Sequence, residues 1–304
     1  MKARRRFIGA GLVTAAALTV ALVSTYAFRS THSTPATAPT ASRTPGVGRR
    51  AIHSRHTAAQ SRRVKARRVT AVPILMYHVI NRPPPGAPFP GLYVRVGAFA
   101  AQMRALAAAG YRGVTLNQVA ENWASGIPLP AGRPIVISFD NGYRSQYTRA
   151  LPILRRLGWR AVENLQLTGL PPSQGGLSTR ETRGLVAAGW ELDTQGFAHL
   201  DLPTLDAAQL RHEVLGARLA IRRRYHVAVR WFCYPSGHYD PTVVAAVRAA
   251  GYEGATTVDP GWASIGDDPY RLPRLRVLGT TTPAGLLALI AGTHENPPPP
   301  ETYG

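Results

Sequence analysis

The sequence predicts an α/β protein, a distorted parallel barrel of strands and helices that follows an N-terminal export segment and a basic linker. From residue 72 onward, short apolar runs rich in β-branched residues alternate with helical patterns. The runs are continuously apolar, as in parallel strands covered on both faces. About eight such strands in about 230 residues favour a closed or nearly closed barrel over an open doubly wound sheet. A glycine-rich phosphate motif does not follow the first run, which disfavours dinucleotide binding.

The first 28 residues indicate export. Lys2 and the run Arg4-Arg5-Arg6 precede an uncharged apolar stretch over residues 7–28, which is close to the ~20 residues needed to cross a bilayer. The arginine run with Phe7 resembles a twin-arginine signal. Because Thr25-Tyr26-Ala27 fits a cleavage site poorly, a cleaved signal peptide and a retained membrane anchor both stay open. Either one predicts an extracytoplasmic location for the rest of the chain.

Residues 29–70 are predicted to be a disordered basic linker, since they lack aromatic residues and carboxylates. Residues 1–70 hold 14 basic residues and no acidic one, so most of the net charge of +20 lies there. The remainder has 22 basic and 16 acidic residues, an ordinary balance, and we expect no nucleic-acid partner. The linker is expected either to contact anionic wall polymer or lipid headgroups, or to act as a solvated spacer.

Local signals define the elements of the domain predicted over residues 71–292, which a Pro-rich tail over 293–304 follows. Capping boxes at Ser178 and Asp206 and the Asp240-Pro241 pair begin three helices, and a further helix is expected over 98–109. Glycines follow several helices where a helix stop is required. The strands are expected at 72–77, 113–116, 134–139, 160–167, 190–194, 229–234, 253–258 and 274–278.

Unusual polar residues gather just after the predicted strands. They are His78, Asp140, Asn141, Gln195, His199, Tyr234 and Asp259. The carboxyl ends of parallel strands meet at one end of a barrel, where barrel enzymes hold their active sites. The sequence therefore predicts a functional site at this end.

Five segments carry a resemblance to a known family. They are VPILMYH (72–78), ISFDNGY (137–143), WELDTQGFAHLDL (190–202), FCYPSGHY (232–239) and YRLPRLR (270–276). In order and spacing, the chain from Val72 to about Ala291 resembles the polysaccharide deacetylase family, which comprises metal-dependent carbohydrate esterases on a distorted α/β barrel. The resemblance implies acetylated polysaccharide or peptidoglycan as the partner and a divalent metal, zinc, as the cofactor if any metal is bound.

The resemblance also implies roles for individual residues. Asp140 takes the position of the general base and His78 that of the general acid. Asn141 stands where the family has a metal-binding Asp, and Gln195 where it has the first of two metal-binding histidines; His199 is the second. Residues that shape the sugar site correspond to Tyr234, Pro235 and Arg274.

Removal of an acetyl group requires activated water, a stabilised oxyanion and a protonated leaving group, and a zinc ion supplies the first two. Zinc prefers Cys, His and carboxylate ligands, so the amides at positions 141 and 195 predict a weak or absent metal site. Two interpretations follow. Asp193 or His238 supplies the missing ligands, or the site has become a polar sugar-binding network that includes the polar residues of strand 160–167.

Trp262 lies in a glycine-rich loop after a predicted strand, where its indole is expected either to stack on a sugar or to join the core. Trp190, Trp231 and the lone Cys233 are expected to be buried. We therefore expect an extracytoplasmic hydrolase that removes acetyl groups from envelope glycan, with a catalytically silent glycan-binding protein as the alternative. A third hypothesis makes the basic tail the functional part.

Overall fold

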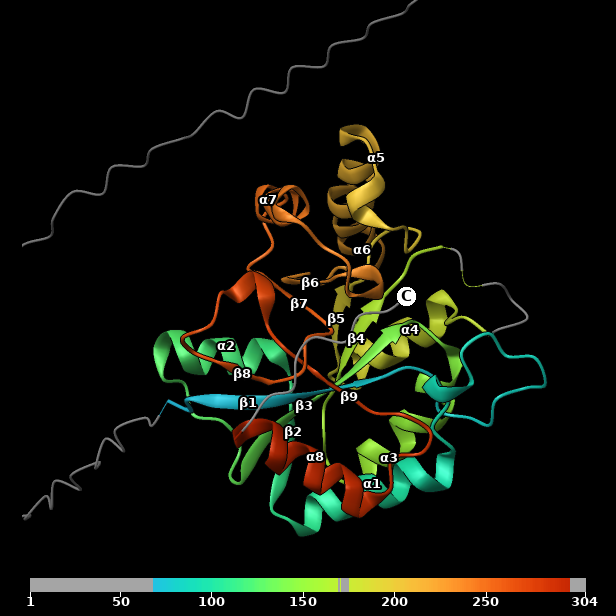
Figure 1. The fold of residues 1–304 in the computed structure, drawn as a ribbon, viewed down its shortest axis with the longest axis vertical. Helices are drawn as coiled ribbons and strands as arrows, with labels where there is room; N and C mark the ends of the chain where they lie inside the picture. The colour runs from blue at the N-terminus through green and yellow to red at the C-terminus, as the bar shows by residue number, and fades with distance from the viewer. Residues whose placement is uncertain (1–67, 169, 171–174, 296–304) are drawn as a thin grey trace, which may run out of the picture. The chain divides into compact units, whose positions relative to one another are not determined.

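The computed structural model describes residues 68–168, 170 and 175–295, and these residues form the predicted α/β barrel. Within them, nine strands form one sheet along the path β7-β6-β5-β4-β3-β1-β8, while β2 pairs with β3 and β9 with β1 off this path (Figure 1). The predicted signal or anchor, residues 1–28, and most of the linker lie outside the described residues.

The strands match the predicted runs within a few residues, with one addition. Trp262–Ser264 was expected to be a loop but pairs antiparallel with the start of β1, with Pro73 opposite Trp262. This strand has only three residues, and glycine and proline lie beside it, so the sequence shows no apolar run there that would predict a strand. The strands are β1 Ala71–Tyr77, β2 Tyr111–Val114, β3 Arg133–Asn141, β4 Val162–Leu165, β5 Glu191–Thr194, β6 Trp231–Cys233, β7 Gly254–Thr256, β8 Trp262–Ser264 and β9 Leu275–Arg276.

Helices cover the outside of the sheet, and α8 runs beside α1 (Figure 1). They are α1 Val96–Ala108, α2 Leu116–Ser125, α3 Leu151–Arg156, α4 Thr179–Ala187, α5 Ala207–Arg211, α6 Ala217–Tyr225, α7 Pro241–Ala249 and α8 Pro283–Glu295, with π-helical turns η2 Gln146–Ala150 and η5 His212–Gly216. The capping boxes at Ser178 and Asp206 are confirmed, and Thr115 forms another at the start of α2. None of the helices in the described ranges is long and apolar enough to span a membrane.

Three buried clusters make up the core. One fills the inside of the barrel, with Val72, Val136, Val162 and Trp231 among its members, and two lie between the sheet and the helices. All of their members lie between residues 69 and 290, and residues 61–304 form one compact unit. A fragment over 61–304 thus contains its complete core and is expected to fold on its own.

A pair of buried acids, Glu191 and Asp193, occupies the inner face of β5. Asp193 Oδ1 accepts hydrogen bonds from the backbone N–H groups of Arg230 (3.1 Å) and Trp231 (3.0 Å), and Glu191 Oε2 accepts one from Asn117 N (2.8 Å). The remaining oxygens, Glu191 Oε1 and Asp193 Oδ2, accept no bond from any donor among the described residues. The two carboxyl groups are neighbours and influence each other's ionisation, so a proton on one of them would supply the donor that these oxygens lack.

The electrostatics of the pair agree with a shared proton. Burial and the neighbouring Asp193 raise the pKa of Glu191 well above its usual range, and burial raises the pKa of Asp193 to about 6. The charged and titratable groups nearest to the pair are the Arg230 guanidinium and the Tyr252 phenol. Arg230 is itself paired with Glu121 and Glu253. The pair is therefore a structural feature of the barrel interior.

We predict that this pair makes the protein less stable as the pH rises. The folded pair retains a proton that unfolded carboxyl groups release above about pH 4, so the free energy of unfolding falls as the pH passes through about 6. Glu191→Gln supplies a permanent N–H donor to Asp193 and should remove about 1 kcal/mol or more of this fall, measured by urea unfolding between about pH 5 and about pH 8. The control Glu253→Gln, at an exposed acid, should keep it. An unchanged pH profile in Glu191→Gln would show that no proton is shared.

Candidate functional site

The Asp140 carboxylate forms the floor of the predicted site at the C-terminal end of β3. Arg274 clamps it with two hydrogen bonds, Nη1 to Oδ1 at 2.7 Å and Nη2 to Oδ2 at 2.9 Å. Asn164 Nδ2 donates to Oδ1 at 2.9 Å, and Gln195 Nε2 lies 3.4 Å from Oδ2. The Cys233 thiol also lies against Oδ2 at 3.6 Å. Both carboxylate oxygens are thus fully engaged inside the protein.

The ion pair controls the protonation of the floor. Burial alone would raise the pKa of Asp140, but the Arg274 charge and its hydrogen bonds hold that pKa well below its usual range. Burial raises the pKa of the Cys233 thiol to about 12, and the thiol is buried as predicted. At neutral pH the floor therefore holds an ionised carboxylate, a guanidinium and an un-ionised thiol.

The two amides at the positions that the resemblance assigns to metal ligands, Asn141 and Gln195, form a hydrogen-bonded network. Gln195 Oε1 accepts from the backbone N–H of Asn141 at 2.9 Å. Asn141 Nδ2 donates to Gln166 Oε1 at 3.1 Å, and Gln166 Nε2 in turn donates to the Thr168 carbonyl at 2.6 Å. Asn141 has a left-handed backbone with φ of 75°, a conformation that Asn tolerates better than most residues. Of the polar residues of the strand predicted over 160–167, Asn164 and Gln166 are thus hydrogen-bonded in the site.

His78 lies beside the floor at the end of β1, and its side chain is buried. Burial lowers the pKa of His78 to about 4, because the attraction of Asp140 only partly offsets it and Arg276, Arg274 and His199 lower it further. Its Nδ1 has no hydrogen-bond partner among the described residues. The imidazole is therefore neutral and retains a free polar atom.

Two further side chains position the site. Gln146, fully buried in η2, donates from Nε2 to the carbonyls of His78 (3.0 Å) and Asp140 (2.8 Å), and thereby fastens the ends of β1 and β3 together. His199 lies on the loop after β5 with φ of 58° and is half-buried. Burial lowers the pKa of His199, so this ring too is neutral at neutral pH. The structure thus gathers six of the predicted residues, His78, Asp140, Asn141, Gln195, His199 and Arg274.

These residues do not fit a zinc ion. Amide side chains replace an anionic and an imidazole ligand, and their atoms already bond to each other, to Gln166 and to Asp140. Over the described ranges, no group of three or more His, Cys, Asp and Glu residues could hold a metal ion. We derive no chemical step through a metal at this site.

The two residues proposed as substitute ligands do not join the network. Asp193 is turned toward the start of β6, where it accepts the backbone hydrogen bonds of Arg230 and Trp231. The two-residue period of a strand predicts a shared face for Asp193 and Gln195, but Gln195 lies beyond the end of β5, and the two side chains bond to different groups. His238 is exposed and pairs through Nδ1 with Asp201 at 3.0 Å.

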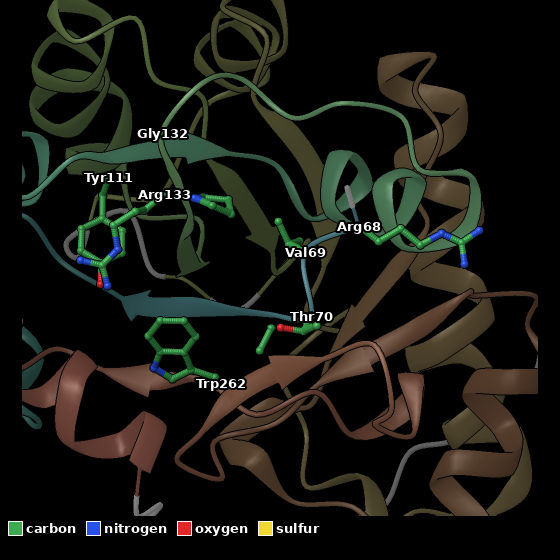
Figure 2. Close-up of a pocket in the computed structure, with 9 residues that line it drawn as sticks. Arg68, Val69, Thr70, Tyr111, Gly132, Arg133 and Trp262 are labelled. Carbon is green, nitrogen blue, oxygen red and sulfur yellow. The ribbon is translucent and has the colours of Figure 1, made fainter. Parts of the chain in front are cut away.

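Trp262 joins the core, the second of its two expected roles, and the predicted sugar contact of Tyr234 is wrong. Trp262 pairs with Pro73 near the start of β1, at the opposite end of the barrel from His78, and its Nε1 donates to the Ile290 carbonyl at 2.9 Å. Figure 2 shows its indole beside the N-terminal part of the sheet. Tyr234 is fully buried, and its hydroxyl donates to the Tyr270 carbonyl at 2.9 Å. Its ring stacks on Tyr239 in the outer core and cannot contact a ligand.

The remaining predicted sugar contacts have structural roles. Pro235 is buried in the turn after β6, close to Gly196. Arg274 is buried and holds Asp140, while its Nε donates to the Thr257 carbonyl at 2.8 Å. Asn164 and Gln146 are site residues to which the sequence analysis assigned no individual role. The excess of polar residues on β4 was the only available signal for Asn164, and Gln146 gave none.

Comparison with known proteins identifies the family of this site. Residues 130–255 match the family model described as polysaccharide deacetylase. The Bacillus subtilis protein YxkH, named for the same activity, is 26% identical over 216 residues, which are 70% of this chain and 74% of that protein. The poly-beta-1,6-N-acetyl-D-glucosamine N-deacetylase of Escherichia coli is 42% identical over 69 residues, only 23% of this chain and 10% of that enzyme.

Solved structures agree with the barrel assignment. The polysaccharide deacetylase of Bacillus cereus has a TM-score of 0.63 at 26% identity over 72% of this chain and 69% of that chain. The Streptococcus pyogenes deacetylase PplD has a TM-score of 0.66 at 24% identity over 73% and 98% of the two chains, which shows a shared fold. Residues 130–255 of the barrel thus match the polysaccharide deacetylase family model, and the barrel is similar to solved deacetylases in fold.

Proposed function

We propose that this domain binds acetylated polysaccharide of the cell envelope and does so without a metal ion. The observation that carries the proposal is the amide network of Asn141, Gln195 and Gln166, which takes up the positions that the family resemblance assigns to metal ligands. A hydrogen-bonded set of neutral side chains is suited to sugar hydroxyl and acetamido groups, which are neutral and both donate and accept.

The floor of the site supports recognition better than turnover. A general base must accept a proton from water, but Arg274, Asn164 and Gln195 bond to the Asp140 oxygens, and the low pKa of Asp140 makes it a weak base. The ring of His199 is half-buried, and the buried Nδ1 atom of His78 has no hydrogen-bond partner among the described residues. We therefore assign ligand contact to His78, Asn141 and His199, and positioning to Asp140 and Arg274.

Acetyl hydrolysis is the second candidate function, and the free Nδ1 of neutral His78 favours it. In this case the imidazole would accept a proton from an attacking water and return it to the leaving amine, and Asp140 would stabilise the transient imidazolium. A pKa of about 4 makes such a base slow at neutral pH. The activities named for the relatives support acetyl hydrolysis. The amide side chains at positions 141 and 195 are poor zinc ligands and therefore oppose a zinc-assisted hydrolysis.

The proposed location is outside the cytoplasm. The basic residues before the apolar stretch 7–28 support export, and polysaccharide of the envelope is accessible from that side. Protease added to intact spheroplasts should degrade the domain, whereas a cytoplasmic control protein should survive. Protection of both proteins would contradict the proposed location.

We predict that fragment 61–304 binds oligomers of β-1,6- or β-1,4-linked N-acetylglucosamine in isothermal titration, that chelator leaves the affinity unchanged, and that no acetate is released. Asn141→Gly keeps the left-handed backbone and removes the amide, so it should weaken binding by about tenfold. The matched control His226→Gly, at another left-handed position at the end of α6, should bind like the wild type. Equal affinity in Asn141→Gly would place the ligand elsewhere. Acetate release that survives chelation and is lost in His78→Gln would support the second candidate instead.

A restoration experiment tests the assignment of the two amides. The double substitution Asn141→Asp and Gln195→His brings an anionic ligand and an imidazole next to His199, and it should create zinc binding at least 100-fold tighter than in the wild type. Competition with a coloured chelator measures this affinity directly. A folded double variant that binds zinc no better than the wild type would show that these three residues do not converge on one point.

A further inference from the structure

Six exposed arginines gather at the end of the barrel where the strands begin, which we call the base. Arg155 and Arg156 form the last turn of α3, and Arg160 lies two residues before β4. Arg222, Arg223 and Arg224 form the last turn of α6. No carboxylate among the described residues pairs with any of the six guanidinium groups.

The six arginines belong to one continuous surface. Helix α4 lies beside α6, since the Nη2 atom of Arg183, in the middle of α4, is 3.4 Å from the Arg224 carbonyl oxygen. Gly189 follows α4 and packs against the side chain of Arg160. A Cβ atom added to Gly189 would lie 3.2 Å from Arg160 Nε. The turns at the ends of α3, α4 and α6 are therefore neighbours. Their charges add to one positive field.

A hollow of about 500 Å³ at the same end adds aromatic rings to the positive charge. Arg68, Tyr111, Arg133 and Trp262 are among the residues that line it (Figure 2). The Arg133 guanidinium lies 4.2 Å from the centre of the Tyr111 ring, and the Trp262 indole is half-buried. The Tyr111 ring is buried beneath Arg133, so Trp262 and the arginines are the groups of the hollow that can meet lipid headgroups, where tryptophan and basic residues are common.

The opposite end, which carries the amide network, has no comparable field. There Arg144 is paired with Glu181 at 2.7 Å, and His238 is paired with Asp201. Asp206 and Asp240 add negative charge where they cap α5 and α7. The exposed arginines of that end, Arg82, Arg95 and Arg180, therefore share it with these acids, whereas the six at the base are not paired with any described carboxylate.

The chain also enters the barrel at the base, because Arg68 precedes β1 at the end where the strands begin. The residues just before it in the sequence include Arg62, Arg63, Lys65 and Arg67, and the apolar stretch 7–28 lies further upstream. We infer that the base of the barrel docks on an anionic lipid bilayer, so that the candidate site faces away from the membrane toward the polymer. The cellular setting rests on the proposed export, whereas the lipid contact can be tested separately from glycan binding.

The test is flotation of fragment 61–304 with vesicles of phosphatidylglycerol and phosphatidylcholine, compared with vesicles of phosphatidylcholine alone. Each arginine near an anionic surface contributes about fivefold to binding, so replacing Arg155, Arg156 and Arg160 together by Gln should weaken the partition coefficient by about 100-fold. The matched control replaces Arg82, Arg95 and Arg180 by Gln, which removes the same charge from exposed positions at the opposite end. It should keep binding within about threefold of the wild type.

The outcomes separate the alternatives. Selective loss in the base variant, with an unchanged melting temperature and unchanged glycan affinity, supports the docking surface. An equal loss of vesicle binding in both triple variants would show that only net charge matters. A wild-type fragment that does not bind anionic vesicles would exclude the lipid partner. Either result overturns the inference. Binding to soluble polyphosphate without binding to vesicles would instead identify a phosphate-rich wall polymer as the partner and would also overturn it. A wild-type fragment that binds anionic vesicles but no N-acetylglucosamine oligomer would count against the proposed function alone.

Discussion

The buried ion pair between Asp140 and Arg274 joins parts of the chain that are 134 residues apart, and much of the barrel depends on it. The same guanidinium reaches the Ser138 hydroxyl and the Thr257 carbonyl, so it connects β3, the segment after β7 and the start of β9. The sheet path runs from β7 to β8 without closing. Removing one partner of such a buried pair costs about 3–5 kcal/mol, because the other charge is left uncompensated.

This clamp also limits the chemistry available to the site. A carboxylate that receives hydrogen bonds on both oxygens is an excellent structural anchor and a poor acceptor of a proton from water. Around this anchor the chain places amides and neutral imidazoles instead of a metal and its ligands. The barrel thus combines a deacetylase-like fold with neutral polar groups at the positions that the resemblance assigns to metal ligands.

The barrel, and the end of the barrel that carries the candidate site, could be predicted from the sequence. The apolar strand runs and the order of the motifs can be recognised without knowing which way each side chain points. The sequence did not predict which way individual side chains turn. Asp193 and Gln195 lie two residues apart, yet Asp193 bonds to the amides of β6 and Gln195 to Asp140 and Asn141. Trp262 follows a strand in the sequence, but an antiparallel return beside β1 carries it to the far end of the barrel. Long-range pairing of this kind leaves no local pattern.

The position of Cys233 gives the protein a built-in reporter. The thiol is sealed between Asp140 and Arg274, at 3.6 Å and 3.2 Å, and it is the single cysteine of the chain. Because its raised pKa and its burial make it unreactive in the closed structure, an alkylating reagent can modify it only when the surrounding strands separate. The rate of labelling therefore measures how often the floor of the site opens, and a ligand that stabilises the floor would slow that rate without any introduced label.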